Sequence, residues 1–367
     1  MRELKLLHAA DLHLDSAFES LSPEQAADRR QGQRELLFSL EEVAEKRGVD
    51  AILLSGDVFE GNSIKSETQR DIGSSLGALS CPVLIAPGNH DPYSVHSIWE
   101  TLRLPDNVFV FKNAELEYVE IKGISARFWG AGFKNTFSPP LLRGFSVPEK
   151  TDDIPDIMVI HGDTSVGASD YNPISRDDLI RCGMDYVALG HIHARTPIMR
   201  AGKTAYAYPG CAEGRGFDEL GEKGALLVTI SDKGISSEFV PLGGVRYEII
   251  SVCIGGKDAY EAVLAATNEL SSNDCVRLIL TGECEMPPDL NALRKSLEGK
   301  FRELQLRDET VMKRDIWAQK GQNTLTGVFL ERLYIMYEAA TNDKEREKVA
   351  LAARYGLSAI ENGGDLI

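Results

Sequence analysis

Five short apolar runs constrain the fold of this chain more than any other feature of its sequence. Each run has the length of a strand and is nearly continuous in Leu, Ile and Val, which is typical of α/β sheets covered on both faces. The runs occupy residues 4–10, 50–56, 82–88, 156–162 and 185–191. A helical pattern follows the first run, with Ser22 as its expected N-cap, Pro23 in the first helical position and Gly48 at its end. We therefore predict an α/β fold.

The segments around these runs complete the expected architecture. Residues 64–80 and 93–103 follow further helical patterns. Shorter strand-like segments separated by turn residues occupy 107–113, 114–123, 125–132, 204–210, 225–231 and 236–242. They predict a second sheet packed on the first, within one domain that covers residues 1–245.

The pattern changes after residue 245. Strand-like and helix-like stretches alternate over residues 246–315, which predicts a small α/β domain. Residues 316–367 carry apolar side chains at helical spacing, among them Leu325, Val328 and Phe329, and predict a C-terminal helical segment.

Composition and charge limit the classes of function. The formal net charge of −16 means that the surface as a whole repels nucleic acid, although carboxylates that bind divalent cations overstate this charge. No run approaches the roughly 18–20 apolar residues of a membrane helix. The first residues meet charge too early for a secretory signal, and the six cysteines show no CxxC pattern. We expect a cytoplasmic protein with no membrane segment.

Polar side chains stand at the end of every apolar run. They are Asp11 and His13, Asp57, Asn89 with His90 and Asp91, His161, and His191 with His193. Five of the seven histidines of the chain lie at these ends. Because ligands collect at the carboxyl ends of strands, five strands of one sheet would bring these side chains to a single edge. Carboxylate, imidazole and amide groups suit Mn, Fe or Zn, and there are enough of them for two ions, as in sites that displace groups at phosphorus.

The ordered pattern DxH, GDxx(D/E), GNH(D/E), H and GHxH resembles the calcineurin-like metallophosphoesterase superfamily over roughly residues 1–245. The stretches "HAADLHLDSAF", "GHIHAR" and "YPGCAEGRGFDELGEKG" resemble more specifically the SbcD-type nucleases that repair DNA double-strand breaks. The resemblance implies a two-sheet sandwich flanked by helices. It also implies a capping domain over residues 246–315, followed by C-terminal helices.

The resemblance also implies roles for the strand-end residues. Asp11, His13, Asp57 and His193 would hold one metal, and Asp57, Asn89, His161 and His191 the other, with Asp57 as the bridge. Manganese is the expected metal, and magnesium, iron and zinc are alternatives. A metal-activated water would attack phosphorus. His90 would contact the scissile phosphate and assist the leaving oxygen, and Asp91 would orient His90 or act only as a turn cap.

The implied function is a phosphodiesterase acting on DNA, an exonuclease or an endonuclease in double-strand-break repair. Its implied partners are a coiled-coil ABC ATPase of the SbcC kind and a second copy of the chain, which would join through helices near residues 64–103. The C-terminal helices would either dock the ATPase or pack against the cap. The alternatives are a phosphoesterase for small molecules or nucleotides and a non-catalytic subunit that senses DNA ends.

Several other residues keep two interpretations. Glu60 stands where relatives often have Asp or a substrate-handling His, and it is either a neighbour of the metal site or a solvent-side residue. His8 belongs to the core or supports the site, His96 is expected on the surface, and residues 164–175 line the substrate groove or form a plain loop. Basic residues that either meet phosphates or form ordinary ion pairs and solvated faces are Arg195, Arg215, Lys295, Lys300 and Arg302.

Overall fold

The computed structural model describes residues 3–61, 63–148, 153–165, 168–313 and 315–361, and these residues form two compact units. The first unit comprises Met1–Ile250, Glu269–Leu278 and Leu297–Gln305. The second comprises Ser251–Asn268, Ile279–Ser296 and Leu306–Ile367. The boundaries expected after residues 245 and 315 stay predictions.

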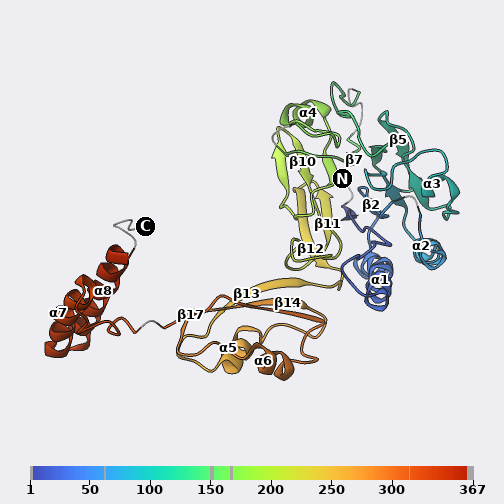
Figure 1. Cartoon of the computed structure of the whole chain (residues 1–367). Coiled ribbons are helices and arrows are strands. Elements are labelled where there is room, and N and C mark those ends of the chain that lie inside the picture. The colour runs from blue at the N-terminus through green and yellow to red at the C-terminus, as the bar shows by residue number, and fades with distance from the viewer. Residues whose placement is uncertain (1–2, 62, 149–152, 166–167, 314, 362–367) are drawn as a thin grey trace. The chain divides into compact units, whose positions relative to one another are not determined.

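Two six-stranded sheets form the centre of the first unit (Figure 1). The first sheet has the order β12-β11-β1-β2-β3-β4, with strands Gly234–Pro241, Gly224–Ser231, Leu4–Ala9, Ala51–Leu54, Val83–Ile85 and Val108–Val110. The second has the order β5-β6-β7-β8-β10-β9, with strands Glu117–Glu120, Arg127–Ala131, Asp156–His161, Tyr186–Gly190, Thr204–Ala207 and Met199–Ala201. Strands β1 to β4 are parallel in the first sheet, and β6, β7, β8 and β10 are parallel in the second. The predicted two-sheet α/β architecture is confirmed.

The five apolar runs do not share one sheet, and this detail of the prediction is wrong. Strands β1, β2 and β3 lie in the first sheet, whereas β7 and β8 lie in the second. A run covered on both faces has the same sequence pattern in either sheet, so the pattern could not separate them. The sheets approach closely at the strand ends, because a Cβ added at Gly190 would lie only 1.9 Å from the carbonyl oxygen of Ser55. The polar strand ends therefore meet between the two sheets.

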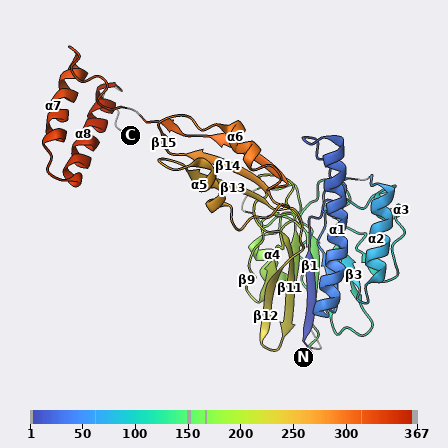
Figure 2. The ribbon, with the colours of Figure 1, turned by 90° about the horizontal axis from the view of Figure 1, so that it is seen from below.

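Alternate side chains of the central strands enter different cores. In β2, Leu53 packs between the two sheets with Leu6 of β1 and Val159 of β7. Its neighbours Ile52 and Leu54 belong to a second core that contains residues of helices α1 (Pro23–Arg47) and α2 (Ser66–Ala78). These two helices lie side by side (Figure 2). Helix α4 (Arg176–Cys182) contributes to a third core with the other face of β7 and β8. Burial on both faces explains why the strands lack polar alternation.

The helix predictions hold for α1 and α2 but not for residues 93–103. Ser22 accepts a hydrogen bond from the backbone N–H of Gln25, and Gly48 ends α1 with φ of 60°, as predicted. Helix α3 spans only Ile98–Thr101. The backbone N–H of Tyr93 donates to the carbonyl of Phe133, and His96 has φ of 64°, so the helix cannot begin earlier.

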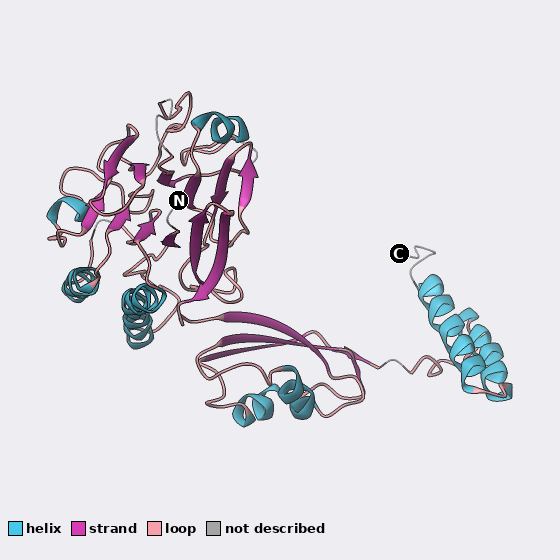
Figure 3. Ribbon diagram, turned by 180° about the vertical axis from the view of Figure 1, so that it is seen from behind, coloured by secondary structure: helices cyan, strands magenta, loops and turns pink. Residues whose placement is uncertain are grey.

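The alternating order predicted for residues 246–315 is present. Strands β13 (Tyr247–Cys253), β14 (Cys275–Thr281) and β16 (Glu303–Asp308) form a three-stranded sheet, with helices α5 (Ala259–Ala266) and α6 (Leu290–Ser296) between them in sequence (Figure 3). Strands β15 (Glu283–Cys284) and β17 (Val311–Met312) pair with each other. Helices α7 (Leu325–Ala339) and α8 (Asp343–Glu361) form the predicted C-terminal helical pair around Leu330, Ala353 and Leu357. Among the described helices, none has both the length and the apolar character needed to cross a membrane.

Candidate metal centre

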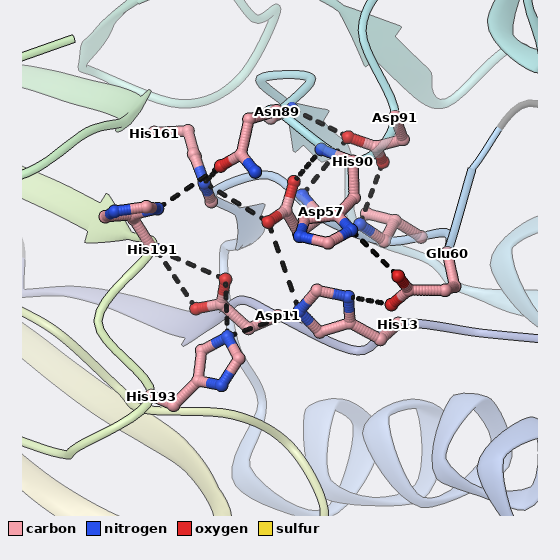
Figure 4. A network of polar contacts seen from close by, with 12 residues as sticks. Asp11, His13, Asp57, Glu60, Asn89, His90, Asp91, His161, His191 and His193 are labelled. Carbon is pink, nitrogen blue, oxygen red and sulfur yellow. Dashed lines mark hydrogen bonds and ion pairs between the residues drawn. The ribbon is translucent and has the colours of Figure 1, made fainter. Parts of the chain in front are cut away.

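The carboxyl ends of β1, β2, β3, β7 and β8 bring the predicted site residues together (Figure 4). They are Asp11, His13, Asp57, Asn89, His90, Asp91, His161, His191 and His193. Side chains able to bind a metal fall into overlapping groups, and one group joins Asp11, His13 and His193 while another joins Asp11, Asp57 and His161. Within each group the ligand atoms lie within 4.8 Å of one another. The ligand assignments stay predictions, but the side chains are assembled for them.

Four of these residues have a backbone conformation that L-residues rarely adopt. The φ angles of Asp11, His13, Asp57 and His191 are 52°, 46°, 51° and 107°. Such conformations cost about 1–3 kcal/mol each and cluster at functional sites, where the surrounding structure holds them. The turn after β3 needs glycine beside this strained backbone, because a Cβ at Gly88 would lie 2.2 Å from Oδ1 of Asp57. Local strain at this edge directs the side chains inward.

The imidazoles of His13 and His193 point lone pairs at the same place. Nδ1 of His13 lies 2.7 Å from Oε2 of Glu60, and Nδ1 of His193 lies 2.6 Å from Oε1 of Glu219. A nitrogen lone pair this close to a carboxylate oxygen would be repelled, so each Nδ1 carries a proton, and in a neutral imidazole Nε2 is then the acceptor. The two Nε2 atoms lie 3.3 Å apart. Oδ1 of Asp11 lies 3.9 Å from Nε2 of His193. Acceptors that converge in this way fit a cation held between them.

A second set of acceptors converges around His161. Its Nδ1 donates to the backbone carbonyl of Ser55 at 2.9 Å, which leaves Nε2 facing Oδ1 of Asn89 at 2.9 Å and Oδ2 of Asp57 at 3.3 Å. Nδ1 of His191 lies 3.2 Å from the same Asn89 oxygen. Oδ2 of Asp57 is also 4.0 Å from Nε2 of His13, so this one oxygen lies between the two sets. These oxygen and nitrogen atoms fit two divalent cations that share Asp57 as a ligand.

Protonation of His161 should compete with metal binding. Burial lowers the pKa of His161, but the carboxylates of Asp57 and Asp11 outweigh this effect and raise the pKa to about 9. Below that pH a divalent cation must displace the proton, so we expect affinity to rise roughly tenfold per pH unit between about pH 6 and pH 8. Calorimetry with Mn²⁺ in buffers of different ionisation enthalpy should show the proton release. His161→Gln should bind the metal more weakly and release fewer protons, whereas His96→Gln should match the natural chain; an affinity independent of pH would contradict this expectation.

Asp91 is a turn cap, the second of its two interpretations, and the structure gives His90 a different partner. The Asp91 carboxylate is fully buried and accepts hydrogen bonds from the backbone N–H groups of Gly88 at 2.7 Å and Val58 at 2.8 Å. It therefore ties the turn after β3 to the turn after β2. Nδ1 of His90 bonds instead to Oε1 of Glu60 at 2.8 Å. Nothing in the sequence indicated that Glu60 would replace Asp91 beside His90, because the folding of the loops alone decides which carboxylate contacts the His90 imidazole.

Glu60 is the neighbour of the metal site, which resolves its two interpretations. Its carboxylate contacts His13 through one oxygen and His90 through the other. Burial alone would raise the pKa of Glu60, but hydrogen bonds to His13 and His90 outweigh it and hold the pKa well below its usual range. The hydrogen bond to Glu60 in turn raises the pKa of His90. The Glu60 carboxylate thus orients both His13, a predicted metal ligand, and His90, the predicted general acid.

Glu219 is a functional neighbour that the sequence analysis missed, and Arg215 is connected to it. Nη1 of Arg215 donates to Glu60 at 3.0 Å, and its Nη2 donates to Glu219 at 3.1 Å. Arg215 thus links the carboxylates that hold His13 and His193. Both residues lie in the stretch "CAEGRGFDELG", whose acidic residues have no spacing that relates them to His193.

The other candidates lie in ordinary surroundings. His8 is buried and joins the two sheets, with Nδ1 2.9 Å from the hydroxyl of Tyr186 and Nε2 3.2 Å from the carbonyl of Leu189. His96 is exposed, as expected. Arg195 stacks on Phe239, with 3.7 Å between its guanidinium carbon and the ring centroid, and Arg302 pairs with Asp28. In the stretch 164–175, whose residues 166–167 are outside the described part, the Tyr171 ring lies 5.1 Å from that of His191.

Comparisons with known proteins agree with this geometry. The sequence profile of the calcineurin-like phosphoesterase family matches residues 4–195. An uncharacterized metallophosphoesterase, YhaO of Bacillus subtilis, is 30% identical over 337 residues, which are 86% of this chain and 81% of that protein. The DNA double-strand break repair protein Mre11 of Methanopyrus kandleri is 25% identical, over 68% of this chain and 57% of its own length. One of the subunits of the nuclease SbcCD of Bacillus subtilis is 30% identical over 92 residues, 24% of this chain and 22% of that protein. The chain belongs to the calcineurin-like phosphoesterase family.

Proposed function

We propose that this chain is a two-metal phosphodiesterase that cleaves DNA, as an exonuclease or an endonuclease in double-strand-break repair. The observation that carries the proposal is the position of Asp57 Oδ2 between two sets of predicted metal ligands, in a group with the imidazole of His90. Two divalent cations bound there would generate a nucleophile from water and neutralise charge developing on the phosphate oxygens. Mixed carboxylate, imidazole and amide ligands favour manganese in this proposal.

His90 would transfer the proton to the leaving oxygen. Its side chain is 42% exposed, whereas those of His13 and His161 are 0% exposed, so it is accessible to a substrate. Its Nδ1 is bound to Glu60, which leaves Nε2 for the leaving oxygen. The pKa raised by that bond keeps the ring protonated over more of the neutral range, as a general acid requires.

Support for DNA as the substrate comes from outside the metal site. The family match ends at residue 195, whereas the similarity to the Mre11 protein of Methanopyrus kandleri covers 68% of this chain and so extends beyond that match. The chain also continues into a small α/β sheet that a small substrate would not require. A large substrate is the better explanation of this added structure.

A substrate panel tests the proposal. The full chain with Mn²⁺ would be assayed on linear duplex DNA, single-stranded DNA, cyclic nucleotides and bis(p-nitrophenyl) phosphate. We expect metal-dependent cleavage of DNA that a chelator abolishes. Cleavage restricted to cyclic nucleotides or to the small ester would overturn the DNA proposal and favour a small-molecule phosphoesterase. No cleavage of any substrate would favour a non-catalytic subunit.

Replacing Glu60 by Gln should lower the rate and shift its pH dependence. Residues that hydrogen-bond to a metal ligand on the side away from the metal typically contribute about 10- to 100-fold to activity or metal affinity. Without the carboxylate, the pKa of His90 falls. A proton donor is active below its pKa, so the alkaline limb of the pH–rate profile should move to lower pH. Glu35→Gln, an exposed change on α1, is the control, and an unmoved alkaline limb in Glu60→Gln would remove His90 as the acid.

The partners are also proposals. Helix α7 exposes Leu325, Val328 and Met336, at 77%, 53% and 58%, and we propose that this face docks a coiled-coil ABC ATPase of the SbcC kind. A homodimer through the region of α2 and α3 is proposed by the same resemblance. Sedimentation velocity tests the dimer. Binding to a purified ATPase of this kind, with Met336→Glu as the disrupting change, tests the dock.

A further inference from the structure

A groove of about 540 Å³ lies in the first unit, next to the metal centre. We name it the stacking groove, and the lining residues that matter here are Arg215, Phe217, Tyr247, Arg277, Glu303 and Gln305. Its volume is within the range of sites that bind small organic groups. Arg215 belongs to both places, because it lines the groove while its Nη1 donates to Glu60 and its Nη2 lies 3.4 Å from Nδ1 of His193. A group in the groove is therefore close to whatever the metal centre binds.

The groove contains a preformed planar stack. The guanidinium of Arg277 lies over the ring of Phe217, with 4.1 Å between its central carbon and the ring centroid. The Tyr247 ring meets Phe217 at 5.0 Å and 84°, which fixes the plane of Phe217. Both Phe217 and Arg277 are only partly buried, so part of the stack is available to a ligand. Aromatic rings and guanidinium planes are the surfaces on which nucleic-acid bases stack.

Polar groups beside the stack are fixed by hydrogen bonds. Nε of Arg277 donates to Oε1 of Gln305 at 2.9 Å, and Nε2 of Gln305 donates to Oε1 of Glu303 at 2.8 Å. Arg277 is on β14, and Gln305 and Glu303 alternate on β16. This row offers both donors and acceptors to the edge of a planar ligand.

The charge of the groove favours a base over a phosphate chain. Its two arginines, Arg215 and Arg277, are balanced by the carboxylates of Asp218 and Glu303, and no lysine is among the described residues that line it. A groove that follows the phosphates of a strand would carry an excess of positive charge. A balanced groove with a flat stack suits a neutral heteroaromatic ring.

From these observations, we infer that the stacking groove binds the nucleobase of the nucleoside next to the scissile phosphodiester. The inference rests on the proposed nuclease function and specifies how an acidic protein recognises DNA there. The reacting phosphate would lie at the metal centre, and the base attached to it would extend the stack of Phe217 and Arg277. Because stacking accepts every base, the groove would bind without marked sequence preference.

Two kinds of substrate separate base binding from catalysis. The 3′- and 5′-p-nitrophenyl phosphate esters of thymidine carry a base, whereas bis(p-nitrophenyl) phosphate carries none, and all three release the same p-nitrophenolate. In the full chain with Mn²⁺, we expect Phe217→Ala and Arg277→Ala to lower kcat/KM by about 10- to 100-fold for at least one thymidine ester and for an oligonucleotide. The value for bis(p-nitrophenyl) phosphate should stay within about twofold, because catalysis does not use the groove.

Matched variants control for folding and for the type of contact. Phe217→Tyr keeps the ring and should retain base-dependent activity, whereas Arg277→Lys keeps the charge without the plane and should not. Lys134→Ala removes a cation–π contact with Tyr93, and Phe38→Ala removes a half-exposed ring on α1, both outside the groove. Both should match the natural chain on all substrates.

The outcomes distinguish the inference from the function on which it rests. Equal losses on all substrates, or full activity of Phe217→Ala on the nucleoside esters and DNA, would overturn the stacking groove while the nuclease proposal stands. A natural chain that cleaves bis(p-nitrophenyl) phosphate but neither thymidine ester nor any DNA would overturn both.

Discussion

Replacing Asp57 by Asn should lower DNA hydrolysis by at least about a thousandfold, because it removes the one oxygen that both metals are expected to share. Oδ2 of Asp57 lies 3.3 Å from Nε2 of His161 and 4.0 Å from Nε2 of His13. In Asn this place is taken by an amide nitrogen, which donates hydrogen bonds and cannot bind a cation. The Asn amide can donate a hydrogen bond to Nε2 of His161, the atom that would otherwise bind the metal.

The same substitution should leave the fold almost unchanged. Oδ1 of Asp57 accepts the backbone N–H of His90 at 2.8 Å, and the amide oxygen of Asn can keep this bond. Metal stoichiometry and the rise in Tm on adding Mn²⁺ should therefore fall, while Tm with a chelator present stays close to that of the natural chain. Activity would be measured as single-turnover cleavage of a labelled oligonucleotide at saturating metal.

Asp71→Asn is the matched control for this prediction. Asp71 lies on α2, where its carboxylate forms an ion pair with Arg34 at 3.1 Å, away from the strand ends. Loss of a partly exposed pair of this kind costs about 1 kcal/mol or less, so activity and metal binding should be kept. Retention of two bound metals and of more than about a tenth of the activity in Asp57→Asn would show that Asp57 is not the bridge.

The sequence could predict that the nine site residues come together, because each stands at or just after the carboxyl end of an apolar strand. A strand end fixes where its next few residues lie, so the topology of the sheets alone brings Asp11, Asp57 and His161 together. The prediction assumed that the five strands share one sheet, which is wrong, but the side chains still meet. Two sheets that meet at Gly190 and Ser55 assemble the same residues.

The contacts behind these residues could not be predicted in the same way. Asp91 and Glu60 both lie close in sequence to the site, and the choice between them as partner of His90 depends on where the backbone N–H groups of two turns point. Once those N–H groups take the Asp91 carboxylate, Glu60 is left for His90. Glu219 reaches His193 from a loop 26 residues further along the chain, and no spacing rule connects them.

Replacing His90 by Asn should lower DNA cleavage by about 10²- to 10⁴-fold, the usual contribution of a general acid, while both metals stay bound. The His90 side chain is more exposed than those of His13 and His161, and Asp57 is held by the backbone N–H of His90, which the substitution keeps. Calorimetric stoichiometry for Mn²⁺ would check the metals, and single-turnover cleavage of an oligonucleotide would check the rate. His96→Asn, which changes an exposed histidine outside the site, should match the natural chain in both.

The leaving group decides whether His90 acts as an acid or only binds the phosphate. An alkoxide leaving from DNA needs a proton, whereas p-nitrophenolate leaves without one, so the deficit of His90→Asn should shrink by at least about tenfold on the p-nitrophenyl esters of thymidine. These esters still carry the base, so a loss of base binding cannot imitate the effect. An equal deficit on DNA and on both esters would assign His90 to phosphate binding in place of proton transfer. Loss of one metal in His90→Asn would instead make His90 a ligand, beside His13 and Asp57, with which it can share a cation.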